Sequence, residues 1–295
     1  MSLPHFGPYV GPDAVVTVAQ ATERFGFHAV SVSERLLMPV RADWSNDAEL
    51  PDSHVWDPLE MLTWAAAHTR RIRVTTGIVN AIFQPPIVLA RRLATLDQLS
   101  RGRLDAGLGQ GGGGTAETSY LIPEEFTAAG VPIGRRGSGF VEHVAAMRAC
   151  WGPDPVEFHG DHYRIPRAVV GPKPYAGTIP LFFGALRRST IERAAQQADG
   201  VVLVAVDWEE TRTQIGWYRD AGGTGTVVVN TIPSYPDGKV TAAAFTDAVV
   251  ADLDRAAAVG ADEMHISLNL VVPVPPEDQA ELLGTLAAEL GLIPA

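Results

Sequence analysis

The chain has 295 residues, of which 46% are hydrophobic, and a formal net charge of −11 at pH 7. Its length can form one large α/β domain or two ordinary ones, and we expect a single domain over residues 1–295. The acidic balance argues against a nucleic-acid groove, because such grooves collect basic side chains and Lys173 and Lys239 are the only lysines.

No apolar run approaches the roughly 20 residues that span a bilayer. The N-terminal sequence also lacks the basic and then apolar pattern of a signal peptide, so we expect a cytoplasmic protein with no membrane contact. The single cysteine, Cys150, can form no internal disulfide, which agrees with a reducing compartment. The histidines lack metal-ligand spacings such as H-E-x-x-H, and no metal site is predicted.

The first half of the chain is expected to alternate strands and helices. The expected elements are a strand at 3–10, a helix at 13–25, a strand at 28–33, a helix from residue 57, a strand at 72–79, a helix from residue 86 and a strand from residue 104.

Residues 71–111 show one complete strand–helix–strand unit. The β-branched run 72–79 predicts a strand, and Pro85-Pro86 stands where the first turn of a helix accepts proline. The helix then carries apolar residues at spacings of three and four: Ile87, Leu89, Ala90, Leu93, Ala94, Leu96 and Leu99. Gly102 ends this helix before the next strand, so the two strands are expected to run parallel with a right-handed crossover.

The second half is expected to continue the alternation after an irregular stretch. The expected elements are a short helix at 123–129, a helix at 140–151, a hairpin within 156–165, strands at 180–183, 201–206, 225–232 and 263–270, and helices at 189–197, 209–220, 242–259 and 276–290.

Eight strand–helix units on one chain predict an α/β fold, specifically a (β/α)8 TIM barrel, whose usual size is about 250 residues before insertions. The irregular stretches 36–56, 112–137 and 152–178 predict insertions after strands 2 and 4 and before strand 5. The rival architecture is a Rossmann sheet, because residues 107–112 satisfy G-x-G-x-x-G after a strand. No helix starts inside that motif, as a dinucleotide site requires, so we favour the barrel.

Three segments in order carry a resemblance to a known family. They are a strand ending in Thr76-Gly77, the helix segment from Leu89 to Leu104, and the strand end Gly107-Leu108-Gly109. In this the chain resembles the luciferase-like family of flavin- and deazaflavin-dependent oxidoreductases, and its branch of F420-dependent reductases most of all. The resemblance implies a TIM barrel that binds coenzyme F420 or FMN, and a homodimer.

In a barrel the chemistry collects at the C-terminal ends of the strands, where the second strand is followed by Glu34 and Arg35. One interpretation is a surface ion pair. The other places both residues against the cofactor ring as catalytic residues, with Arg35 as a fixed positive charge where the reduced ring becomes anionic. Many family members have a histidine in place of Arg35, so this chain lacks that proton donor.

The third and fourth strands end in further candidate cofactor-binding residues. The resemblance implies a bulge or a non-proline cis bond at Gly77 and Ile78 that supports the ring from behind, and Asn80 can reach a ring carbonyl or a substrate. Glycines at a strand end allow a flat ring or a phosphate to approach the backbone closely. The glycines of this kind on the fourth strand are Gly107, Gly109 and Gly111.

A phosphate site is predicted where the fifth strand leads into a helix. Backbone N–H groups at a helix start attract anions, and Arg187 adds a guanidinium there. The resemblance places the cofactor phosphate in the same loop. The matching residues are Leu186, Arg187 and Thr190, and Ala185 in the same loop is a further candidate cofactor-binding residue. The competing interpretation is an ordinary helix cap beside surface arginines.

These observations predict an oxidoreductase that passes a hydride between F420 and an unsaturated or carbonyl-type small organic substrate. The first alternative is an FMN-dependent monooxygenase supplied with reduced flavin by a partner flavin reductase. The second is a non-catalytic barrel, because about ten residues at 112–122 are inserted after the fourth strand relative to the family pattern and could disrupt the cofactor site.

Overall fold

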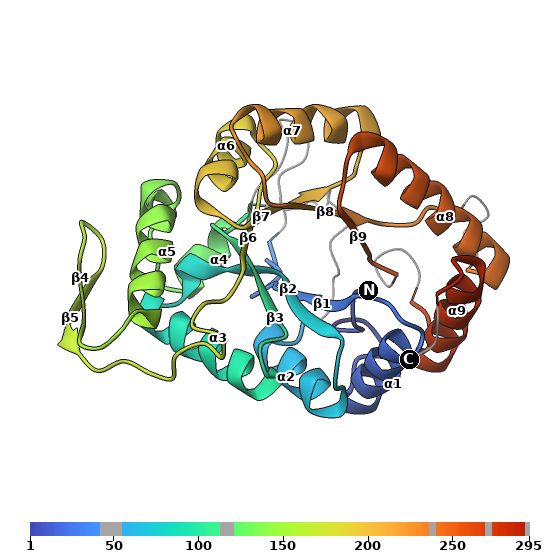
Figure 1. The fold of residues 1–295 in the computed structure, drawn as a ribbon, viewed down its shortest axis with the longest axis horizontal. Coiled ribbons are helices and arrows are strands. Elements are labelled where there is room, and N and C mark those ends of the chain that lie inside the picture. The colour runs from blue at the N-terminus through green and yellow to red at the C-terminus, as the bar shows by residue number, and fades with distance from the viewer. Residues whose placement is uncertain (42–54, 113–120, 236–239, 269–272, 293–295) are drawn as a thin grey trace.

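The computed structural model describes residues 1–41, 55–112, 121–235, 240–268 and 273–292. They form a ring of parallel strands surrounded by helices, as the barrel prediction requires (Figure 1). The strand order is β1-β2-β3-β6-β7-β8-β9, so each strand pairs with the next barrel strand along the chain. No helix among the described residues is long and apolar enough to cross a membrane.

The barrel strands are short and their inward and outward faces are both mostly buried, as in other parallel sheets covered by helices. Their bounds are Ala29–Ser33 (β1), Arg73–Asn80 (β2), Leu104–Gly109 (β3), Leu181–Gly184 (β6), Gly200–Val204 (β7), Thr226–Thr231 (β8) and Glu263–Ile266 (β9).

The helices lie on the outside of the strands and bury one face each. Their bounds are Pro12–Arg24 (α1), Pro58–His68 (α2), Pro86–Ser100 (α3), Pro123–Ala128 (α4), Ser138–Trp151 (α5), Arg188–Gln197 (α6), Trp208–Asp220 (α7), Ala242–Val259 (α8) and Pro276–Glu289 (α9), with short 3-10 turns at Ala81–Phe83 (η1) and Ile133–Arg135 (η2).

The N-terminal segment closes the ring between β9 and β1. The Ser2 N–H donates to the Ile266 carbonyl at 2.9 Å, and the Leu3 N–H donates to the Ser31 carbonyl at 2.8 Å. Only this short piece pairs, so the prediction of a strand over residues 3–10 is wrong. Pro4 and Pro8 have no N–H to donate, and the segment turns between them.

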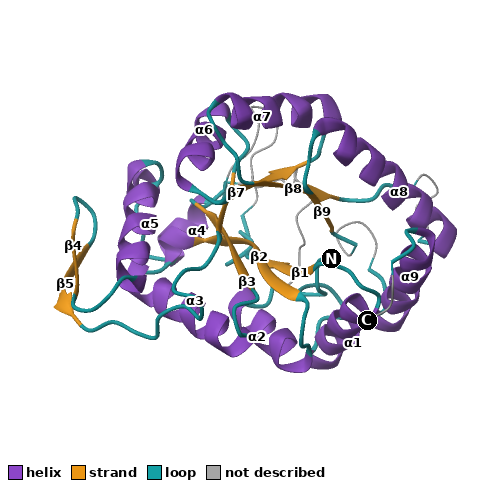
Figure 2. Cartoon of the chain, viewed as in Figure 1, coloured by secondary structure: helices purple, strands orange, loops and turns teal. Residues whose placement is uncertain are grey.

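The predicted insertions lie where the sequence places them. Loop residues follow β1, and α4 and η2 follow β3 before the next helix, α5. An antiparallel hairpin, β4 (Val156–His159) and β5 (Arg164–Ala168), precedes β6 and projects away from the ring of helices (Figure 2). The parts of these insertions at 42–54 and 113–120 lie outside the described residues.

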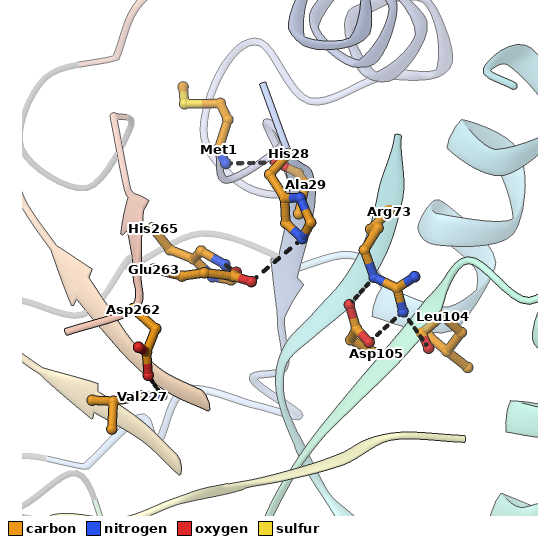
Figure 3. A network of polar contacts seen from close by, with 10 residues as sticks. All are labelled: Met1, His28, Ala29, Arg73, Leu104, Asp105, Val227, Asp262, Glu263 and His265. Carbon is orange, nitrogen blue, oxygen red and sulfur yellow. Dashed lines mark hydrogen bonds and ion pairs between the residues drawn. The ribbon is translucent and has the colours of Figure 1, made fainter. Parts of the chain in front are cut away.

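Charged side chains fill the barrel at the N-terminal ends of the strands. Arg73 on β2 forms an ion pair with Asp105 on β3, and Glu263 on β9 lies 3.3 Å from His28 and 3.4 Å from His265 (Figure 3). His265 is buried, as expected of a histidine pointing into the barrel. The C-terminal ends of the strands, where a (β/α)8 barrel carries its ligand site, lie opposite these polar pairs.

Candidate active site

A cavity of about 360 Å³ opens at the C-terminal ends of the strands. Strand ends of β1, β2, β3, β6, β7 and β8 and the start of α6 line it. The predicted site residues that line this cavity are Glu34, Arg35, Ile78, Asn80, Gly109, Gly111, Ala185, Leu186, Arg187 and Thr190. Gly77 faces a small space inside the barrel instead, and Gly107 is packed between strands.

The backbone of β2 bulges at Gly77 and Ile78. Thr76 pairs with Val32 of β1, but the next β1 residue, Ser33, pairs with Ile78, so β2 contains one extra residue. The pairing between β2 and β3 shifts over the same interval. Both cis bonds among the described residues precede prolines, so the expected distortion takes the form of a bulge and not of a cis bond.

The bulge directs the Ile78 side chain over two glycines at neighbouring strand ends. A Cβ atom at Gly109 would lie 2.7 Å from Ile78 Cγ2, and one at Gly184 would lie 2.6 Å from Ile78 Cδ1. At Gly107 a Cβ would lie 2.3 Å from the Thr76 carbonyl oxygen. These glycines are therefore required by packing within the protein, and Ile78 supplies an apolar floor to the cavity.

Glu34 is held at the end of β1 by the backbone of β2. Its N–H donates to the Ile78 carbonyl at 3.0 Å, and its Oε2 accepts the Asn80 N–H at 2.6 Å. Burial raises the pKa of Glu34 to about 7, although the Asn80 N–H acts in the opposite direction. The nearby carboxylates of Asp57 and Glu125 raise this pKa further.

Arg35 forms an ion pair with Glu125 of α4 and not with its neighbour in the sequence, Glu34. The Arg35 Nη1 lies 3.1 Å from Glu125 Oε2, and Glu125 is fully buried. The other oxygen, Oε1, accepts the Leu36 N–H at 2.8 Å. Glu125 therefore fixes the loop after β1. It also neutralises the positive charge of Arg35, which was predicted to lie against the cofactor ring.

Three arginines line the cavity near α6: Arg136, Arg187 and Arg193. Arg136 donates to the Gly112 carbonyl at 3.2 Å, and its buried Nε has no hydrogen-bond partner among the described residues. Arg193 donates to Gln110 Oε1 at 3.2 Å. No carboxylate of the described residues forms an ion pair with Arg136 or Arg193, so within the described part of the chain the positive charges of these two arginines are not balanced by an ion pair.

Burial lowers the pKa of two of these arginines, and repulsion by a neighbouring guanidinium lowers the pKa of one of them further. Burial lowers the pKa of Arg136, and the nearby guanidinium of Arg187 lowers it further. Burial likewise lowers the pKa of Arg193. A bound anion would relieve both effects, because it replaces lost hydration and screens the like charges.

Thr190 lies at the start of α6 and is held there by two hydrogen bonds to the backbone of Arg187. Its hydroxyl donates to the Arg187 carbonyl at 2.7 Å and accepts the Arg187 N–H at 3.2 Å, so it caps α6. It also lines the cavity, as Ser189 does. The loop before α6 is thus fixed in shape beside the arginines.

Sequence reasoning missed four of the residues at this site: Gln110, Glu125, Arg136 and Arg193. Glu125 was predicted only as part of the short helix at 123–129, and Arg136 only as part of the irregular stretch 112–137. Arg193 lies three residues after Thr190 on α6, which places both on one helix face. The spacing of three residues could therefore have identified Arg193 from the sequence. Arg136 and Glu125 lie on a loop and on α4, and the sequence does not give the positions of these segments relative to the barrel.

A parallel (β/α)8 barrel with a ligand-sized cavity at its C-terminal mouth defines the class of protein. Residues 3–273 match the model of the luciferase-like monooxygenase family, and the chain belongs to that family.

Known proteins of this family and fold differ in their reactions. An uncharacterised protein of Mycobacterium tuberculosis is 32% identical over 197 residues, 64% of this chain and 67% of that protein. The F420-dependent glucose-6-phosphate dehydrogenase of the same species is 26% identical over 204 residues, 69% of this chain and 56% of that protein. The monooxygenase RslO1 from Streptomyces bottropensis shares the fold with a TM-score of 0.76 and 23% identity, over 98% of this chain and 97% of that chain.

Proposed function

We propose that this protein is an oxidoreductase that transfers a hydride between coenzyme F420 and an unsaturated or carbonyl-type small organic substrate. The observation that carries the proposal is the charge of Arg136 and Arg193, which no ion pair within the described residues balances, in a cavity floored by Ile78. F420 combines a flat ring with a phosphate-bearing tail, so it matches both the arginines and the apolar surface of Ile78. The relation to an F420-dependent dehydrogenase supports the choice of cofactor.

The residues at the arginine end fit an anionic group. Within the part of the chain that the structure describes, the buried Arg136 Nε lacks a hydrogen-bond partner, and leaving such a donor unpaired costs about 1–3 kcal/mol or more. A phosphate oxygen would satisfy it. Arg136, Arg187 and Arg193 would hold the phosphate, and the α6 start would add backbone N–H groups.

The part of the cavity lined by Ile78 and Asn80 fits the ring and the substrate. The apolar side chain of Ile78 would support one face of the ring, and the amide of Asn80 offers both a donor and an acceptor. The bound cofactor supplies the hydride chemistry, while the protein positions the ring and sets its electrostatic surroundings.

A fluorescence titration of the purified protein with F420, with FMN in parallel, tests the proposal. We expect F420 fluorescence to be quenched at micromolar protein. Tight FMN binding, with oxygen consumption when a flavin reductase supplies reduced FMN, would instead support the monooxygenase alternative. Failure of both cofactors to bind at high concentration would support the non-catalytic alternative.

The arginines provide the matched variants for this titration. We expect Arg136→Ala and Arg187→Ala each to weaken F420 binding about 10- to 100-fold, because each removes a charge-assisted hydrogen bond to the phosphate. Arg188→Ala is the control, since Arg188 is exposed and pairs with Glu192 on the surface of α6. Unchanged affinity in the first two variants would remove the phosphate assignment.

We also propose that the protein is a homodimer, as the family resemblance implies. The outer faces of α2 and α3 border a groove that exposes several large apolar side chains. They are Trp64, Ile87, Val88 and Leu99. Apolar surface gathered in this way is typical of protein–protein contacts.

A further inference from the structure

We propose that Glu34 is the acid that exchanges a proton with the substrate, and that Glu125 keeps it available for this role by binding Arg35. The inference rests on the proposed hydride transfer, because that reaction needs a proton at the same site. It assigns the proton to a residue of this chain that directly follows strand β1.

The geometry fixes one oxygen of Glu34 and leaves the other unbound. Oε2 accepts the Asn80 N–H at 2.6 Å, which anchors the carboxyl group to the bulged strand. No described residue donates a hydrogen bond to Oε1. Glu34 lines the cavity together with Ile78, so the carboxyl group borders the space proposed for ring and substrate.

Arg35 would otherwise keep Glu34 ionised. A guanidinium next to a carboxylate favours the charged form and thereby opposes proton donation. Here the Arg35 Nη1 is bound 3.1 Å from Glu125 Oε2, and the buried Glu125 also accepts the Leu36 N–H. Glu125 therefore neutralises the positive charge of Arg35.

The other charged groups around Glu34 act in both directions. Asp57 at the start of α2 and Glu125 on α4 favour the protonated form, whereas Arg92 on α3 favours the ionised form. Arg92 is itself bound to Glu60, at 2.6 Å. Arg136, Arg187 and Arg193 line the same cavity and are assigned to the phosphate. Burial is the largest influence, and the pKa of Glu34 is raised to about 7.

With a carbonyl substrate, Glu34 supplies the proton that completes the reduction. The carbonyl carbon receives the hydride with its electron pair, and the π electrons of the C=O bond move to oxygen. That oxygen takes the proton from the Glu34 carboxyl group, which becomes a carboxylate and is reprotonated from solvent. The substrate is reduced by two electrons and the cofactor is oxidised by two. In the reverse direction the Glu34 carboxylate accepts the proton.

Carboxyl titration of the protein without cofactor tests the inference directly. In protein labelled with 13C at glutamate carboxyls, the signal absent from Glu34→Gln identifies Glu34. We expect its titration midpoint near pH 7. A midpoint below pH 5 would overturn the proposal, because the group would then hold no proton at neutral pH.

Two variants test the surroundings of Glu34. Asp57→Asn keeps a good N-cap for α2 but removes a negative charge, so the Glu34 midpoint should fall. Glu125→Gln should lower it too, because it removes a second negative charge and releases Arg35. A midpoint that stays unchanged in Glu125→Gln would overturn the part assigned to Glu125.

Thermal unfolding gives a second measurement without cofactor. The folded state binds more protons than the unfolded state between the unfolded pKa of about 4.5 and the folded pKa of about 7, so ionising Glu34 weakens the fold across that interval. Glu34→Gln should therefore gain melting temperature relative to the wild type as pH rises from 5 to 8. A pH-independent difference would contradict the assignment.

Measurements with cofactor separate this inference from the proposed function. Glu34→Gln should bind F420 within about threefold of the wild type but lose about 100-fold or more in kcat, the usual contribution of a general acid. An equal loss in F420 affinity would make Glu34 a binding residue and overturn the proposal. If the wild type binds no F420, the proposed function fails, whereas the carboxyl titration still decides whether Glu34 holds the proton.

Discussion

Ile78 connects the backbone irregularity of β2 to the shape of the cavity. Its side chain occupies the space that Gly109 and Gly184 leave at the ends of β3 and β6. A side chain at either glycine would push Ile78 toward the region proposed for the cofactor ring. The three positions therefore form one packing unit.

Gly109→Ala tests this packing unit. The added Cβ would meet Ile78 Cγ2 at 2.7 Å, and overpacking of this kind typically costs about 1–3 kcal/mol. We expect a lower free energy of unfolding in a denaturant titration and weaker F420 binding. Gly216→Ala is the control, because that exposed position on α7 has open space, and it should raise stability by up to about 1 kcal/mol. Equal stability of Gly109→Ala and wild type would contradict the account.

At the residue scale, the sequence indicates those site residues that directly follow a predicted strand. Glu34 and Asn80 were found in this way, since strand ends of a barrel meet at one rim, and Arg187 was found because it precedes a predicted helix start. Glu125 and Arg136 reach the rim from α4 and from the loop before α5, and no periodicity in the sequence gives that approach. Glu125 neutralises the positive charge of Arg35, and Arg136 adds a guanidinium beside the predicted phosphate site.

At the element scale, helix α3 shows where an apolar pattern misleads. Its seven apolar positions predict one buried face, but Leu99 is 61% exposed and Ile87 is 37% exposed. The other five are buried against the barrel. An apolar position on a helix can thus face either the core of its own chain or a partner, and the spacing is the same for both.

Leu99→Arg tests whether the exposed part of α3 contacts a second copy. A charged side chain at the centre of an apolar contact disfavours association, so we expect a dimer for the wild type and a monomer for the variant in light scattering. Because Leu99 is exposed, the variant should fold normally. Leu290→Arg, at the end of α9, is the matched control. A wild type that is already monomeric would contradict the dimer proposal.

At the scale of the whole molecule, the alternation of strands and helices was sufficient to predict the barrel. The exception is the first strand, reduced to a pairing at Ser2 and Leu3, because hydrogen-bond partners decide pairing and prolines remove donors. The rival Rossmann sheet fails for the reason given by the sequence: no helix begins within residues 107–112. Gly111 in that motif instead packs against Phe126 of α4.

The central claim is that one cavity holds a flat redox cofactor, with its phosphate at the arginines and its ring at the bulge. A crystal structure of the protein with F420 bound tests this most directly. We predict the phosphate within hydrogen-bond distance of Arg136 and Arg187, and the ring packed on Ile78 beside Glu34. A cofactor bound elsewhere, or one whose phosphate lies away from these arginines, would contradict the account.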